Sequence, residues 1–147
     1  MKKVILMSIS SELLVKILNS EKTIVIRRTM PKCELPIDVY LYCTKTNKKG
    51  WCMVGINGNE TYYQKYDRNA VYSSGHNYIG NSKVVAKLTL MEVYAGDNNI
   101  YAYHMENLEI FDKPFELREF STSPYTDWVE YRVRKAPQSW QYVYKEE

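Results

Sequence analysis

The 147-residue chain has the length of one domain, and its 45% hydrophobic residues suffice to bury a core, which excludes wholesale disorder. The net charge of +3 does not by itself indicate a nucleic-acid partner. Residues 1–86 hold 13 lysines and arginines against 6 acidic residues, residues 87–130 hold 3 against 9, and residues 131–147 hold 4 against 2. A basic surface would form if the first and last segments shared a face; ordinary solvated charge is the alternative.

Cysteine usage and hydropathy favour a cytoplasmic protein. The three cysteines, Cys33, Cys43 and Cys52, form no Cys-x-x-Cys pair, and only two histidines accompany them, so we expect no structural zinc site and no other cofactor. The apolar run near the N-terminus is short and leads into a helix, so we interpret it as a strand rather than a signal peptide. No run approaches the roughly 20 apolar residues of a membrane span.

The first half of the chain predicts strands with one early helix. Residues 3–9 are typical of a strand, and Ser10 or Ser11 caps a helix with an apolar stripe that ends near residues 19–20. Strands are then predicted at 22–29 and 37–44, separated by a loop between two prolines at 31–36. Residues 51–56 and 61–66 flank Asn57-Gly58, which indicates a hairpin.

The second half predicts further strands with a late helical insert. Residues 67–82 are expected to form a loop, residues 83–94 a long strand, 108–111 a short strand and 140–144 the last strand, with helical turns at 115–120. This order predicts a single α+β domain over residues 1–147, a small β-barrel with short helices at its ends.

Residues 21–29, EKTIVIRRT, carry the clearest functional signal. An apolar strand centre has Lys22 at one end and Arg27 and Arg28 at the other, and such cations are costly to bury unless an anion meets them. Phosphate is the anion that proteins most often recognise with these side chains. Strand alternation places Arg27 and Arg28 on opposite faces, so both cannot line one narrow pocket without a bulge. The alternative is that Lys22 and Arg27 form ion pairs with acids such as Glu106 or Glu109.

Two further segments are candidate ligand contacts. Thr44 and Lys45 end a strand before a basic turn and suit a phosphate backbone, unless the turn is only a solvated hairpin tip. Gln138, Ser139 and Trp140 enter the last strand; Gln can bond to a base edge and Trp can stack on a base, although Trp140 also suits a core. His104 suits an acid/base role or a structural one.

Several stretches together resemble one family, the ASCH domains of the PUA-like superfamily. Residues 21–27 (EKTIVIR), after an early strand and helix, resemble the family as a whole. A closer resemblance, to a branch in phages and prophages of low-GC Gram-positive bacteria, involves the segments 31–36 (PKCELP), 42–45 (YCTK), 83–87 (KVVAK), 107–108, 112–114 and 137–140 (PQSW).

The resemblance implies a PUA-like barrel that recognises RNA or modified nucleotides. One bacterial relative is an amidohydrolase that deacetylates acetylated cytidine, and its similar segment reads KTITIR, with the Lys and the second Thr in catalysis. The Lys matches Lys22, but Val25 stands where the second Thr would be and supplies no nucleophilic hydroxyl. This departure argues against the same hydrolytic mechanism.

Three functions therefore stay open. We favour a non-catalytic module that binds RNA or a nucleotide through Lys22, Arg27, Arg28, Thr44, Lys45 and the 138–140 loop. The second is a hydrolase on RNA or a modified nucleoside, in which Lys22 acts with Glu106, Glu109 or His104. The third is a phage protein that opposes host defence, by sequestering a nucleotide signal or blocking a host protein, and it rests on the resemblance alone. The sequence does not indicate an oligomeric state.

Overall fold

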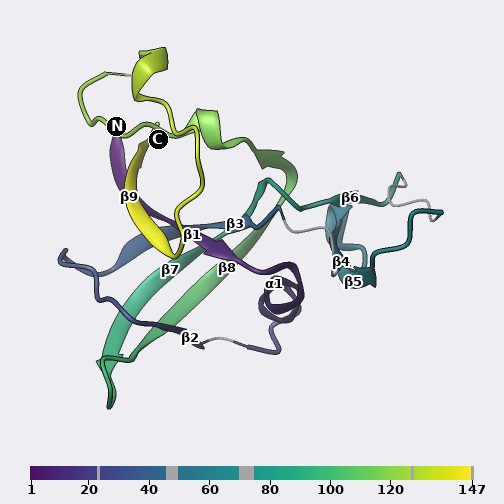
Figure 1. The fold of residues 1–147 in the computed structure, drawn as a ribbon, viewed down its shortest axis with the longest axis horizontal. Helices are drawn as coiled ribbons and strands as arrows, with labels where there is room; N and C mark the ends of the chain where they lie inside the picture. Colours follow the sequence, from purple (N-terminus) through teal and green to yellow (C-terminus); the bar gives the residue numbers. More distant parts are fainter. Residues whose placement is uncertain (23, 46–49, 70–74, 127, 147) are drawn as a thin grey trace.

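The computed structural model describes residues 1–22, 24–45, 50–69, 75–126 and 128–146. Figure 1 shows a strongly curved sheet with one helix and a smaller sheet at its side. The elements in chain order are β1 (Lys2–Ile9), α1 (Ser11–Leu18), β2 (Ile24–Arg27), β3 (Ile37–Cys43), β4 (Gly50–Gly55), η1 (Ile56–Gly58), β5 (Tyr62–Lys65), β6 (Asn77–Ile79), β7 (Val84–Ala95), β8 (Tyr101–Phe115), η2 (Leu117–Glu119), η3 (Val129–Tyr131) and β9 (Trp140–Lys145). No helix in the described ranges is both long and apolar enough to cross a membrane.

The large sheet has the strand order β2-β8-β7-β3-β1-β9, and the small sheet has the order β5-β4-β6. The pair β1–β3 is parallel and the other pairs of the large sheet are antiparallel. Because β9 pairs with β1, the C-terminal segment lies beside the N-terminal strand, as the basic-surface interpretation requires. Helix α1 contacts the small sheet, mostly through β4.

Two apolar cores cover the two faces of the large sheet, and β1 contributes to both. Its side chains alternate between them: Ile5, Met7 and Ile9 lie in the core under α1, whereas Val4 and Leu6 lie in the core formed with Phe120. Because both faces of β1 are buried, its sequence is a continuous apolar run rather than an alternation of apolar and polar residues. The predicted helix follows directly, with Leu14, Ile17 and Leu18 buried against the first core.

The prediction of a closed barrel is wrong, although the α+β mixture of strands and one helix holds. The large sheet ends at β2 on one side and at β9 on the other, and no ladder joins these two edges among the described residues. Side chains bridge them instead: Trp140 at the start of β9 donates to Thr29, just after β2. The bridge brings the ends of β2 and β9 together without closing the sheet.

Most predicted elements are confirmed, and the main error concerns β8. The sequence predicted a strand only at 108–111, whereas β8 extends over fifteen residues. Asn107 has a φ of 59° inside it, and the register with β7 shifts there. Tyr103 and Met105 face the core before this bulge, but Leu108 and Ile110 face it afterwards, so the alternation breaks in mid-strand.

Three smaller predictions also differ from the structure. Strand β2 begins at Ile24 and ends at Arg27, so Lys22 and Arg28 lie outside it. The expected loop at 67–82 contains the short strand β6. The helical turns expected at 115–120 reduce to the three residues of η2, because β8 continues through Phe115.

Candidate ligand-binding site

Strand β2 lies at an edge of the large sheet, and its two faces have different surroundings. Val25 is 1% exposed, whereas Ile24 and Ile26 are 41% and 47% exposed. The predicted alternation is therefore confirmed within the strand: Val25 and the half-buried Arg27 face inward, and the two isoleucines face outward. Lys22 precedes the strand and does not follow this alternation.

Arg27 is held by carbonyl groups rather than by an acid. Its guanidinium donates to the main-chain oxygen of Ser8 at 3.0 Å and to its own neighbour Ile26 at 2.8 Å. Its Nε is buried without a hydrogen-bond partner among the described residues. Burial lowers the pKa of Arg27 from its ordinary value, and Tyr103 offsets this only in part. The positive charge of Arg27 is thus partly desolvated, and no carboxylate among the described residues forms an ion pair with it.

Thr29 joins β2 to the first residues of β9. Its hydroxyl accepts a hydrogen bond from the indole nitrogen of Trp140 at 2.9 Å, and its carbonyl accepts one from the hydroxyl of Tyr103. Ser8 holds the loop before β9: its amide donates to Ser139 and its hydroxyl to Pro137. Because Arg27 also binds Ser8, the segment after β2 and the loop before β9 meet at one place.

A hollow of about 660 Å³ opens beside this junction, and we call it the basic hollow. Its lining consists of Arg28, Thr29, Met30, Pro31, Lys32, Cys33, Asn99 and Tyr101. It contains two cations and no acidic residue, and neither Arg28 nor Lys32 forms a side-chain ion pair with any residue that the structure describes. Threonine, asparagine and tyrosine add hydrogen-bonding groups, so the lining suits an anion.

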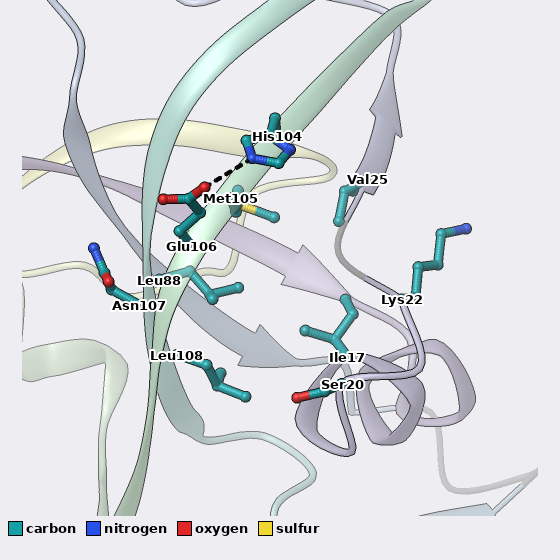
Figure 2. A pocket seen from close by; sticks show the side chains of 10 residues that line it. All are labelled: Ile17, Ser20, Lys22, Val25, Leu88, His104, Met105, Glu106, Asn107 and Leu108. Carbon is teal, nitrogen blue, oxygen red and sulfur yellow. Dashed lines mark hydrogen bonds and ion pairs between the residues drawn. The ribbon is translucent and has the colours of Figure 1, made fainter.

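A second pocket, of about 380 Å³, lies between α1, β2 and β8 (Figure 2); we call it the α1–β8 pocket. Its apolar lining comprises Ile17, Val25, Leu88, Met105 and Leu108, and its polar lining comprises Ser20, Lys22, His104, Glu106 and Asn107. It lies where β2 begins at Ile24, opposite His104, because the residues of β8 that follow His104 have no β2 residue beside them. His104 and Glu106 lie two residues apart on the strand, and their side chains are 3.1 Å apart.

Lys22 lines this pocket, but Figure 2 shows its amine extending away from the His104–Glu106 pair. Val25 occupies the pocket wall between them with its methyl groups and is almost fully buried. The pocket therefore combines an apolar floor with a histidine–carboxylate pair, but Val25 offers no hydroxyl to a bound molecule.

The structure brings some of the predicted residues together and leaves others apart. Arg27, Ser139 and Trp140 meet at the Thr29–Ser8 junction, and Arg28 lines the basic hollow next to it. Lys22 belongs to the α1–β8 pocket instead.

The other predicted ligand contacts, Thr44, Lys45 and Gln138, are not among the residues that line the two hollows. Thr44 donates its amide to Ile9 and extends the β1–β3 pairing, while Lys45 and Gln138 are exposed. The basic turn predicted at Lys48-Lys49 lies outside the described residues.

The predicted ion pairs of Lys22 and Arg27 with acids are not formed in the described part of the chain. Glu106 contacts His104, and Glu109 contacts Lys87 at 3.4 Å across β7 and β8. Neither acid forms an ion pair with Lys22 or Arg27 among the described residues, and the Arg27 guanidinium is instead held by carbonyl oxygens.

Sequence reasoning missed Ser8, Thr29, Lys32 and Tyr101. Lys32 carried the only readable signal, a cation inside the predicted loop between two prolines. Ser8 acts through its main-chain oxygen, which sequence patterns do not reveal.

The donor sets of these two hollows do not suit a metal ion. No group of three or more His, Cys, Asp or Glu side chains within the described ranges is arranged to hold one.

No protein-family model matches the chain, and neither the curated proteins nor the solved structures contain a significant match.

Proposed function

We propose that the protein is a non-catalytic module that binds RNA or a nucleotide, of the ASCH or PUA-like type that its sequence resembles. The observation that carries this proposal is the set of cations at the end of β2. Arg27 is partly buried against carbonyl oxygens, and Arg28 and Lys32 line a hollow without an acid. A guanidinium binds phosphate through two parallel hydrogen bonds, and binding of an anion would offset its desolvation.

Aromatic side chains beside these cations support a nucleotide over inorganic phosphate. Tyr101 lines the basic hollow, and Trp140 lies at the adjoining junction with Tyr142, their ring centroids 5.2 Å apart. A base stacks on such rings while its phosphate meets the cations. Trp140 is already engaged with Thr29, so we assign it a positioning role and assign stacking to Tyr101.

The test compares two variants that each lose two positive charges. Arg28→Gln/Lys32→Gln alters the basic hollow, and Lys16→Gln/Lys65→Gln removes exposed lysines of α1 and β5. Affinity for a fluorescent single-stranded RNA of about 12 nucleotides is measured by anisotropy between low and physiological salt. We expect the first variant to bind at least about tenfold more weakly and to lose roughly 1.4 from the slope of log K against log salt, since each phosphate contact contributes about 0.7. Equal behaviour of both variants would contradict the proposal.

A hydrolase is the second candidate, and the His104–Glu106 pair in the α1–β8 pocket favours it. The pair resembles an oriented acid/base group beside an apolar floor, with Lys22 at the rim. Incubation with acetylated cytidine and with labelled RNA between pH 5 and pH 9 tests it. Product that forms with the wild type and disappears with Glu106→Gln would replace the binding proposal by this one; intact substrates throughout would exclude it for these substrates.

A further inference from the structure

The segment from η2 to the residues before β9 forms a second cationic surface, remote from β2. Figure 1 shows it beyond the end of the sheet where both termini lie, whereas β2 lies at the opposite side of the view. Two adjoining hollows of about 420 and 460 Å³ share the lining residues Arg118, Val133 and Arg134. We call them together the arginine groove. Glu119, Val129 and Arg132 complete the first hollow, and Ser82, Glu116 and Leu117 complete the second.

The arginines are placed by the buried residue between them. Val133 is 3% exposed and packs in the core with Phe120, and its amide donates to the carbonyl of Phe120 at 3.0 Å. Its neighbours Arg132 and Arg134 therefore line the groove instead of the core. Arg132 in turn donates to the carbonyl of Arg118 at 2.9 Å, which ties the two sides of the groove together.

Two glutamates, Glu116 and Glu119, line the groove and have internal partners, whereas two of the arginines have none among the described residues. Glu116 pairs with Lys83, whose hydrogen bond lowers the pKa of Glu116, and Glu119 accepts the amide of Glu116 at 2.7 Å. The guanidinium groups of Arg118 and Arg134 form no hydrogen bond or ion pair with any residue in the described ranges. The groove therefore holds three arginines against two glutamates, and the guanidinium groups of Arg118 and Arg134 keep their planar donors for a ligand.

The segment that carries two of these arginines also carries exposed aromatic side chains, and Trp128 directly precedes Val129, which lines the first hollow. Tyr125 is 93% exposed and Trp128 is 65% exposed, although such rings are usually buried. The backbone that carries them is nevertheless fastened: Thr122 donates to Tyr131 at 2.7 Å, and Ser121 exchanges hydrogen bonds with Tyr144 of β9. Backbone hydrogen bonds thus fix both ends of the segment that carries the two rings.

We propose that the arginine groove and its exposed rings bind single-stranded nucleic acid. Guanidinium groups take the phosphates, and Trp128 and Tyr125 stack on unpaired bases, a combination that single-strand binding surfaces use. A duplex would leave the rings without bases to stack on. An acidic protein segment would satisfy the arginines but would offer no flat partner to the two exposed rings. This site does not depend on the basic hollow at β2.

The experiment uses the full chain and the labelled single-stranded RNA described above. Arg118→Gln/Arg134→Gln removes the two unpaired guanidinium groups, and Lys16→Gln/Lys65→Gln is the control with the same loss of charge. We expect the arginine variant to bind at least about tenfold more weakly, with a salt slope lowered by roughly 1.4. Trp128→Ala should weaken binding roughly 5- to 100-fold with an unchanged salt slope, because stacking releases no counterions.

Three comparisons decide the result. Far-UV circular dichroism and thermal unfolding first establish that each variant is folded like the wild type. If RNA binding falls only in Arg28→Gln/Lys32→Gln, the groove proposal is overturned and the function proposed for β2 stands. If RNA binding falls only in the arginine-groove variants, the groove proposal stands and the site proposed at β2 is wrong. If a labelled glutamate-rich peptide binds more tightly than RNA and is lost with Arg118→Gln/Arg134→Gln, the surface is a protein-binding one and the proposal is wrong.

Discussion

The hydrogen bond between Trp140 and Thr29 is the contact by which the two open edges of the large sheet meet, and its contribution to stability can be measured in isolation. The two atoms, Trp140 Nε1 and Thr29 Oγ1, are 2.9 Å apart. Trp140→Phe removes the donor and keeps an aromatic ring, and Thr29→Val removes the acceptor and keeps the shape. The main-chain oxygen of Thr29, which accepts from Tyr103, is present in every variant.

The magnitude follows from the geometry. A neutral hydrogen bond contributes about 0.5–1.5 kcal/mol net, and this one is solvent-exposed, so we expect a coupling free energy of about 0.5–1 kcal/mol. The loss of ring area in Trp140→Phe, including part of its edge-on contact with Tyr142, occurs with and without Thr29 and cancels in the double-mutant cycle. For a chain of this length each kcal/mol lowers the melting temperature by about 2–4 °C.

Urea unfolding of the wild type, both single variants and the double variant gives the four free energies. The single variant Trp140→Phe should be destabilised by about 1–2 kcal/mol, because it loses both the hydrogen bond and apolar area. If the coupling free energy is below about 0.3 kcal/mol, which is the scatter of independent sites, the bond does not hold the edges together and the account given for the β2–β9 junction is refuted.

Three further predictions concern the pocket, the pH dependence and the hairpin. Val25→Thr should lower the free energy of unfolding by about 1–3 kcal/mol in urea titrations, because it places a hydroxyl at a site that is 1% exposed; deacetylation of acetylated cytidine by this variant would contradict a non-catalytic pocket. Burial raises the pKa of Tyr103 to about 12, so its neutral form stabilises the fold below pH 10 and that contribution is lost as the pH rises through about 12; Tyr103→Phe should show a shallower loss of stability over this range. Gly55→Ala should cost more than about 2 kcal/mol, because a Cβ there would lie 1.8 Å from the carbonyl oxygen of Asn59, while Gly75→Ala, with open space around it, should stay within about 0.5 kcal/mol of the wild type by thermal unfolding.

Local sequence patterns were sufficient to predict most of the helices and strands, including β2, the strand that carries the candidate site. The apolar run of β1, the helix α1 and the hairpin around Asn57-Gly58 follow from spacing alone, because side-chain period and turn chemistry are local properties. Ser10 stands at the N-cap of α1 as expected, but its side chain makes no capping hydrogen bond. The alternation of β2 likewise predicted that Val25 and Arg27 share one face and that Arg28 points away from it, and the structure shows that the shared face is the buried one.

The extent of β8 could not be predicted in this way. Its bulge at Asn107 depends on how β7 and β8 pair, and that pairing joins residues that no single window of sequence contains. The α1–β8 pocket lies beside this bulge and at the start of β2, so the sequence could not predict that His104, Glu106 and Lys22 line one pocket.

By itself the sequence determined the strand-rich α+β composition, the cations around the 24–27 strand and the absence of a hydroxyl at Val25. Only the tertiary structure decided which cations share a site. It separated Lys22 from Arg27, joined Arg27 to the 137–140 loop through Ser8 and Thr29, and left the sheet open where a closed barrel was predicted. The physical reason is that charges near one another in the chain are set apart by strand alternation, whereas residues more than a hundred positions apart are brought together by the curvature of the sheet.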